Sequence, residues 1–75
     1  MAVAYILITT EPMKEHTVYG TLCKANDVDE VHPLYGEWDL IVKVSAETRE
    51  QLKETILDKI IYAEGILATK TLFGY

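Results

Sequence analysis

The segment Ala2–Thr10 constrains the fold of this chain more than any other part of the sequence. It is rich in Tyr, Ile, Leu, Val and Thr, the residue types that favour β-strands, and apolar side chains occupy both of its alternating faces. A strand that is buried on both sides has this pattern, so we expect it to lie in the middle of a sheet. Each face of that sheet must then be covered, either by the chain itself or by another molecule.

The rest of the sequence predicts two helices and three more strands around this segment. The first helix is predicted from Pro12, with the proline at the first helical position, to about Ala25. The second opens with a capping box formed by Thr48 and Gln51 and ends at 63–65. Apolar spacing predicts the packing stripes of the two helices, which are Val18, Leu22 and Ala25 in the first and Leu52, Ile56, Ile60 and Tyr62 in the second.

The three further strands are predicted at 28–35, 38–45 and 66–75. Pro33 cannot donate to a strand ladder, so its strand is expected at a sheet edge or at a bulge. In the last strand Leu67, Thr69, Thr71 and Phe73 alternate with Ile66, Ala68, Lys70 and Leu72. The order βαββαβ predicts an α+β, ferredoxin-like sandwich, a four-stranded antiparallel sheet with two helices on one face. The other face of the sheet carries a good share of the apolar side chains, and no predicted element covers it. We therefore expect a second copy of the chain to pack on it.

Length and composition set further limits. With 75 residues the chain has room for one domain, residues 1–75, and such small domains often need a disulfide, a metal or self-association. Cys23 is the only cysteine, which excludes a disulfide within one chain. His16, His32 and Cys23 lack the spacing of a zinc site, so we predict no metal and no cofactor. Self-association remains as the expected stabiliser.

The charge and hydropathy of the chain limit which partners it can bind, in particular nucleic acids and membranes. The net charge is −5 and no run of Lys or Arg is present, which argues against direct binding of nucleic acid. No apolar stretch approaches the length of a membrane span, and no leader pattern is seen at the start. We therefore expect a cytoplasmic protein that binds neither membranes nor DNA by itself.

A candidate binding site lies in the segment 34–42, where Gly36 separates two strand-like runs. Gly-X between apolar runs predicts a two-residue hairpin with a positive φ at Gly36. Such a turn presents backbone N–H groups beside Asp39, which suits a small zwitterion: the N–H groups match a carboxylate and Asp39 matches an ammonium. The alternative is an ordinary hairpin with a polar tip.

The order and spacing of three stretches, 4–12, 35–44 and 64–72, resemble those of the effector domain of Lrp/AsnC transcription regulators, called the RAM domain. The resemblance covers essentially the whole chain. It implies a ferredoxin-like fold, dimers that pack sheet to sheet, rings of dimers, and amino-acid effectors bound where dimers meet. The full-length family carries a helix-turn-helix domain before this module. Because this chain opens directly on the first strand, we expect it to resemble the stand-alone RAM proteins.

The resemblance also suggests which residues bind an effector. It places Gly36 and Trp38 in the loop that meets the ligand carboxylate, and Asp39 at the ammonium. Thr69 and Thr71 lie two apart on one strand, so both hydroxyls face the same way and are expected to line the same site, although threonine also simply favours strands. Trp38 stands where the family usually has Tyr, and Ala68 replaces a small hydroxyl residue.

The predicted function is an effector-binding module whose partners are an amino acid, further copies of itself and full-length Lrp/AsnC regulators. Two other classes of function remain. One is a purely structural assembly partner of related regulators. The other is a small dimeric α/β-barrel enzyme, which would need a cleft between sheet and helices. No catalytic residue is predicted: His32 has no recognisable nucleophile or base partner and is expected to be a packed core histidine, and Cys23 a small buried hydrophobe.

Overall fold

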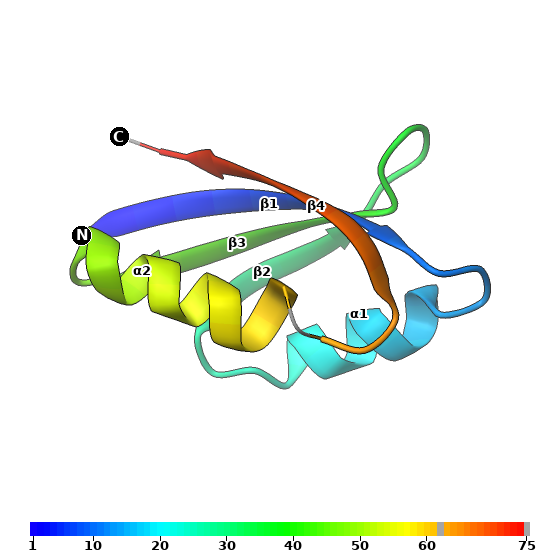
Figure 1. Cartoon of the computed structure of the whole chain (residues 1–75), viewed down its shortest axis with the longest axis horizontal. Helices are drawn as coiled ribbons and strands as arrows, with labels where there is room; N and C mark the ends of the chain where they lie inside the picture. Colours follow the sequence, from blue (N-terminus) through cyan, green and yellow to red (C-terminus); the bar gives the residue numbers. More distant parts are fainter. Residues whose placement is uncertain (62, 75) are drawn as a thin grey trace.

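The computed structural model describes residues 1–61 and 63–74. Its elements follow the predicted βαββαβ order (Figure 1), and they are β1 (Ala2–Thr10), α1 (Glu15–Cys23), β2 (Val28–Pro33), β3 (Leu40–Ala46), α2 (Arg49–Ile56), the π-helical turn η1 (Leu57–Ile61) and β4 (Ile66–Phe73). The four strands form one sheet in the order β2-β3-β1-β4, and every neighbouring pair is antiparallel. The ferredoxin-like prediction is confirmed, including the inner position of β1.

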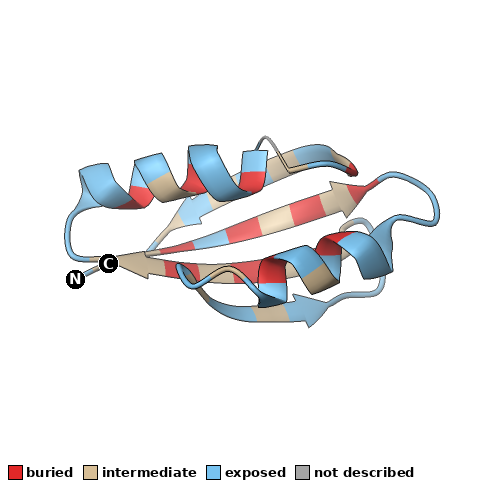
Figure 2. Cartoon of the chain, turned by 90° about the horizontal axis from the view of Figure 1, so that it is seen from below, coloured by how far each residue is buried: buried red, intermediate tan, exposed pale blue. Residues whose placement is uncertain are grey.

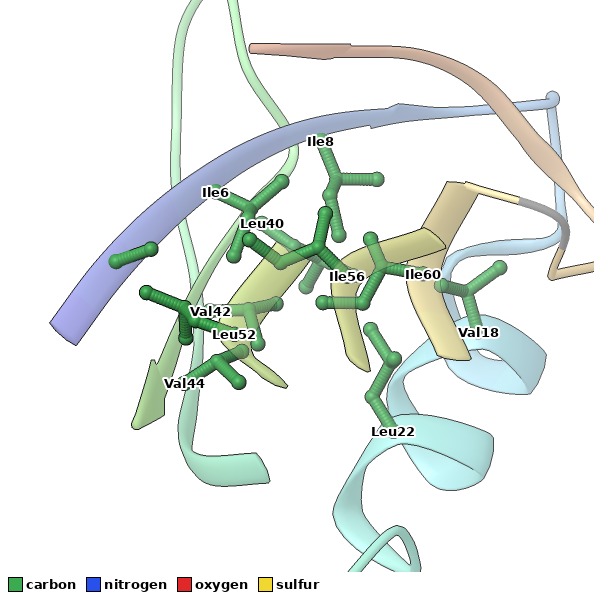
Figure 3. Packing of buried hydrophobic residues seen from close by; sticks show 11 residues of the cluster. Ile6, Ile8, Val18, Leu22, Leu40, Val42, Val44, Leu52, Ile56 and Ile60 are labelled. Carbon is green, nitrogen blue, oxygen red and sulfur yellow. The ribbon is translucent and has the colours of Figure 1, made fainter. Parts of the chain in front are cut away.

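Strand register explains how the two faces of the sheet differ. Ile6 pairs with Val42 on β3 and with Thr71 on β4, so these three side chains lie on the same face. Both helices cover that face (Figure 2). The buried hydrophobic residues between sheet and helices are all aliphatic (Figure 3), and they are Ala4, Ile6, Ile8, Val18, Leu22, Leu40, Val42, Val44, Leu52, Ile56 and Ile60.

Helix α1 begins later than predicted. Met13 has a φ of 68°, and the N–H of Lys14 donates to the carbonyl of Glu11 at 3.0 Å, so residues 11–14 form a turn. A residue with positive φ cannot belong to an α-helix, and the placement of Pro12 at the first helical position is therefore wrong. The predicted packing stripe is confirmed at Val18 and Leu22, both 1% exposed.

Helix α2 begins as predicted, because the hydroxyl of Thr48 accepts a hydrogen bond from the N–H of Gln51 at 3.2 Å. Leu52, Ile56 and Ile60 are buried as expected, whereas Tyr62 lies outside the described residues. The turn at Leu57–Ile61 is π-helical, and the spacing of apolar residues did not predict this change of helix type. Among the described residues no helix is both long and apolar enough to cross a membrane.

Strand β4 contains an irregularity that changes the predicted alternation. Thr10 pairs with Ile66, but the preceding Thr9 pairs with Ala68, so Leu67 is an extra residue in the ladder. Leu67 is 60% exposed, and Ile66 packs against the core in its place. The predicted grouping of Leu67 with Thr69 is therefore wrong, because a bulge reverses the side-chain alternation before residue 68. The predicted end of this strand, Tyr75, lies outside the described residues.

The second face of the sheet is free of helices, because both helices lie below the strands in Figure 1, and none of the described elements covers it. We call it the open face. Leu7 pairs with Ile41 on β3, and Tyr5 pairs with Lys43 on β3 and with Leu72 on β4. Tyr5 and Leu72 are 39% and 45% exposed. The predicted apolar share of this face is confirmed for the single chain, although Lys43 and Lys70 also lie on it.

Candidate functional site

The connection between β2 and β3 is longer than predicted. The N–H of Leu34 donates to the carbonyl of Asp39 at 2.8 Å, but the N–H of Asp39 donates to the carbonyl of Ile8 on β1 at 2.9 Å. Because Asp39 pairs with two strands at once, the β2–β3 ladder stops there and residues 34–39 form an open loop. The prediction of a two-residue hairpin is thus wrong. The predicted positive φ at Gly36 is confirmed, with a value of 122°. The loop points away from the helices (Figure 1).

Asp39 ties this loop to the end of β1. Its Oδ2 atom accepts the N–H of Thr10 at 2.8 Å and the hydroxyl of Thr10 at 3.2 Å. Thr10 is only 5% exposed, and Asp39 is half-buried. Within the described part of the chain, no hydrogen bond reaches the other carboxylate oxygen, Oδ1, and no buried side-chain oxygen is left without a partner. Oδ1 therefore faces solvent and is free to accept from a ligand.

A groove of about 520 Å³ runs between α1 and the base of the loop. Two predicted site residues, Gly36 and Asp39, line it, while the half-buried Trp38 is not among its lining residues. The remaining lining combines apolar and polar side chains, and it consists of Glu15, His16, Tyr19, Pro33, Leu34, Tyr35 and Leu40. We call this space the loop groove.

Thr69 and Thr71 lie on the helix-covered face of β4, opposite Ile8 and Ile6. Their predicted common orientation is confirmed. Thr71 lines a second, smaller groove of about 290 Å³, the β4 groove, together with Lys53, Ile56, Leu57, Ile61 and Phe73. Thr69 lines neither groove. A single protomer therefore brings Gly36 and Asp39 together but keeps Thr71 at a separate place.

The sequence did not point to the residues that α1 contributes to the loop groove. Tyr19 does not belong to the predicted packing stripe of the first helix, yet it lines the groove and is 38% exposed. The pKa of Tyr19 is raised, chiefly by a hydrogen bond with Cys23. Cys23 is exposed, so its expected burial is wrong, since it lies on the solvent side of a short helix. The position of α1 relative to the loop depends on tertiary packing that periodicity does not describe.

The prediction that His32 is a packed core histidine is also wrong. The His32 side chain is 62% exposed on the edge strand, and its Nε2 lies 3.1 Å from Oε1 of Glu30. Lys43 Nζ lies 3.7 Å from the other Glu30 oxygen. The hydrogen bond from His32, with a smaller contribution from the charge of Lys43, lowers the pKa of Glu30 below its ordinary value. No group of three or more metal-ligating side chains occurs among the described residues.

The structure is thus a small α+β domain with a groove beside a strand-connecting loop. Residues 3–74 match the family described as the Lrp/AsnC ligand binding domain. The chain belongs to this family.

Relatives agree with this assignment. An uncharacterized HTH-type transcriptional regulator of Pyrococcus abyssi is 33% identical over 96% of this chain and 50% of its own length. The hypothetical protein PHS023 of Pyrococcus horikoshii has a solved structure with a TM-score of 0.93 and 37% identity, covering 100% of this chain and 90% of its own. The regulator NMB0573 of Neisseria meningitidis, solved in complex with L-Met, shares the fold with a TM-score of 0.83 and 17% identity. The match covers 99% of this chain and 49% of the regulator.

The chain spans about half the length of the curated relatives it matches, 50% in the first case. The family that matches is a ligand binding domain, and the Pyrococcus abyssi relative is described as a transcriptional regulator. The α/β-barrel enzyme, considered as an alternative from the sequence, is therefore not supported.

Proposed function

We propose that this chain is an effector-binding and assembly module that senses an amino acid or a related small metabolite in transcriptional or metabolic regulation. The observation that carries the proposal is the loop groove, where a fixed carboxylate and a glycine with positive φ line the same space. This combination suits a zwitterion, since Asp39 Oδ1 is free to accept from an ammonium group. Backbone N–H groups of the loop near Gly36 and Trp38 would donate hydrogen bonds to the ligand carboxylate.

The chemistry of the groove favours a ligand with an apolar portion. Pro33, Leu34 and Leu40 line it together with the rings of Tyr19 and Tyr35. Burial of aliphatic ligand atoms against these side chains would add to the polar contacts. The shared fold of the Neisseria regulator, solved with L-Met, is compatible with such a ligand.

Thr69 and Thr71 would complete the site from a neighbouring copy. In one protomer Thr71 lines the β4 groove rather than the loop groove. A site that uses both Asp39 and the threonines therefore requires that the loop of one copy approach β4 of another. Effector binding and assembly would in this way be coupled.

Assembly itself would begin at the open face. Tyr5, Leu7, Ile41 and Leu72 form an apolar surface there, and a second copy would bury it in an isologous dimer. Rings of such dimers, and mixed assemblies with full-length Lrp/AsnC regulators, belong to the same proposal. With a net charge of −5, the chain is expected to act in the cytoplasm without contacting DNA itself.

Isothermal titration with the twenty L-amino acids tests the proposal. Asp39→Ala would weaken binding by roughly 1.5–3 kcal/mol and Thr71→Val by about 0.5–1.5 kcal/mol, the ranges for charged and neutral hydrogen bonds. Asp39→Asn is the cleaner variant, because it removes the charge but keeps an oxygen that can accept from Thr10. Glu37→Gln, in the same loop but outside the groove lining, is the matched control and should bind as wild type does. Equal binding by wild type and Asp39→Asn would contradict the proposed site.

If wild type binds none of the twenty, the structural assembly partner becomes the better description. Its signature would be a dimer or a larger ring by light scattering, with no heat of binding for any amino acid. Tight, salt-sensitive retardation of duplex DNA by the pure protein would contradict both forms of the proposal.

A further inference from the structure

Thr10 is the one polar residue in the described core, and its surroundings set it apart from the other threonines. It is 5% exposed at the end of β1, where the bulge in β4 changes the register between Thr9 and Thr10. Its N–H and its hydroxyl both donate to the same oxygen, Oδ2 of Asp39, at 2.8 and 3.2 Å. Two donors from one rigid strand residue hold one carboxylate oxygen in a defined position.

The direction of these bonds has a consequence for the carboxylate. With Oδ2 engaged by Thr10, rotation of the Asp39 carboxylate would break both bonds, so Oδ1 is held on the side that faces solvent. Asp39 also lines the loop groove, and its own N–H and C=O are bound to Ile8 and Leu34. The carboxylate is thus fixed both through its backbone and through its side chain. A preorganised acceptor binds a cation with a smaller loss of side-chain freedom than a mobile one.

We propose that Thr10 is a positioning residue for ligand recognition: its hydroxyl and N–H hold Asp39 so that Oδ1 meets the ammonium group of a bound α-amino acid. This inference rests on the proposed function and adds the origin of its selectivity. Thr10 does not line the loop groove and does not touch the ligand itself. It acts through the orientation of Asp39 alone.

The experiment compares two probes that differ only at the group Asp39 would recognise. The twenty L-amino acids are titrated first, and the tightest of them is paired with the α-hydroxy acid that bears the same side chain. The measured quantity is the ratio of the two affinities, because a general loss of stability would weaken both probes alike. Wild type is expected to favour the amino acid over the hydroxy acid.

Thr10→Val removes the hydroxyl at nearly constant volume. We expect it to reduce this ratio by about three- to tenfold, less than the loss of a direct hydrogen bond to a charged group, because the Thr10 N–H still holds Oδ2. Thr10→Ser keeps the hydroxyl and should restore the ratio. Thr9→Val, at the neighbouring position on the open face, should leave the ratio unchanged. In an Asp39→Asn background Thr10→Val should have no further effect on the ratio, because the charge it positions is gone.

Circular dichroism and thermal melting establish that each variant is folded, and Thr10→Ala serves in place of Thr10→Val if the buried methyl group prevents folding. An unchanged ratio in the folded Thr10 variant overturns this inference and leaves the proposed function standing. The same holds if wild type binds an amino acid and its hydroxy acid equally well. If wild type binds none of the twenty amino acids, both the inference and the proposed effector site are overturned.

Discussion

The two faces of the sheet use neighbouring residues of the same strands for opposite purposes. On β1, Ile6 is 0% exposed under the helices, whereas the next residue, Leu7, is half-buried on the open face. On β3, Val42 is 0% exposed, whereas Ile41 is half-buried. One face is completed by the chain's own helices. The other is left uncovered, although Leu7 and Ile41 are as apolar as their neighbours under the helices and lie there among charged side chains such as Lys43 and Lys70.

This difference shows which part of the burial the chain achieves alone. The helix-covered face forms a core of aliphatic side chains, and its contribution to stability does not depend on protein concentration. Burial on the open face would come only with a second copy, so its contribution would grow with concentration. Folding and assembly should therefore be separable by mutation, one face at a time.

The largest effect is expected for Ile6→Ala, which leaves a cavity between sheet and helices. We expect the free energy of unfolding to fall by about 2–5 kcal/mol. Leu7→Ala, one residue away on the open face, should cost only about 1 kcal/mol at low protein concentration, because the side chain is already partly exposed. Urea denaturation of both variants at the same concentration measures the difference. Equal losses would mean that the two faces are not energetically distinct.

The next effect concerns assembly. Leu7→Asp places a carboxylate in the proposed sheet-to-sheet interface, and we expect the dimer dissociation constant to rise about a hundredfold because the charge would lose its water on association. The monomer should stay folded. Light scattering at micromolar concentration reports the mass. Met13→Asp is the control: Met13 is 94% exposed in the turn before α1, lines neither groove, and its substitution should leave the dimer intact. A wild-type protein that is monomeric at this concentration would contradict the prediction.

A smaller effect is expected from the helix that covers the buried face. Thr48→Ala removes the side-chain acceptor for the Gln51 N–H and should lower the unfolding free energy by about 1 kcal/mol. Thr48→Ser retains the hydroxyl and should behave nearly as wild type. Denaturation midpoints measure the stability, and the mass by light scattering should not change. A loss of the dimer in Thr48→Ala would show that the two faces are coupled.

The smallest effect is a pH dependence on the open face. Glu30 has a lowered pKa there, so the stabilisation from His32 and Lys43 is present above the ordinary pKa of a glutamate and is lost as the pH falls through the lowered value. His32→Ala should raise the pKa of Glu30 toward its ordinary value, as followed by NMR titration of the glutamate side chain. His16→Ala, at the other histidine, should leave the pKa of Glu30 unchanged. Because Glu30 is exposed, we expect little change in overall stability.

The sequence predicted the features that depend on local pattern. The alternation around Ile6 and Ile8 identified the inner strand, the spacing of Leu52, Ile56 and Ile60 identified a packing face, and Thr48 identified a helix start. These features were predictable because side-chain periodicity and capping act over a few residues. The family resemblance, carried by the order of three stretches, is confirmed as well.

Other features depend on contacts between distant segments, and the sequence did not reveal them. The loop at 34–39 opens because Asp39 pairs with Ile8, and the extra residue Leu67 appears only when β4 is aligned with β1. The role of Thr10 follows from its contact with Asp39, 29 positions along the chain. All five candidate effector residues remain predictions, and two of them, Trp38 and Thr69, line neither the loop groove nor the β4 groove.

The irregular edge strand β2 has a consequence for how copies of this chain meet. The N–H of Leu34 points toward β3, so position 33 faces the outer edge, where proline offers no donor to an incoming strand. The register shift between Val28 and Glu30 leaves Asp29 bulged, with its carboxylate held by the Ser45 hydroxyl at 2.6 Å. Such an edge resists the addition of further strands and the fibril-like growth that would follow. A chain with apolar side chains on its open face is thereby protected against aggregation through this edge, which favours the proposed stacking of copies over extension of the sheet.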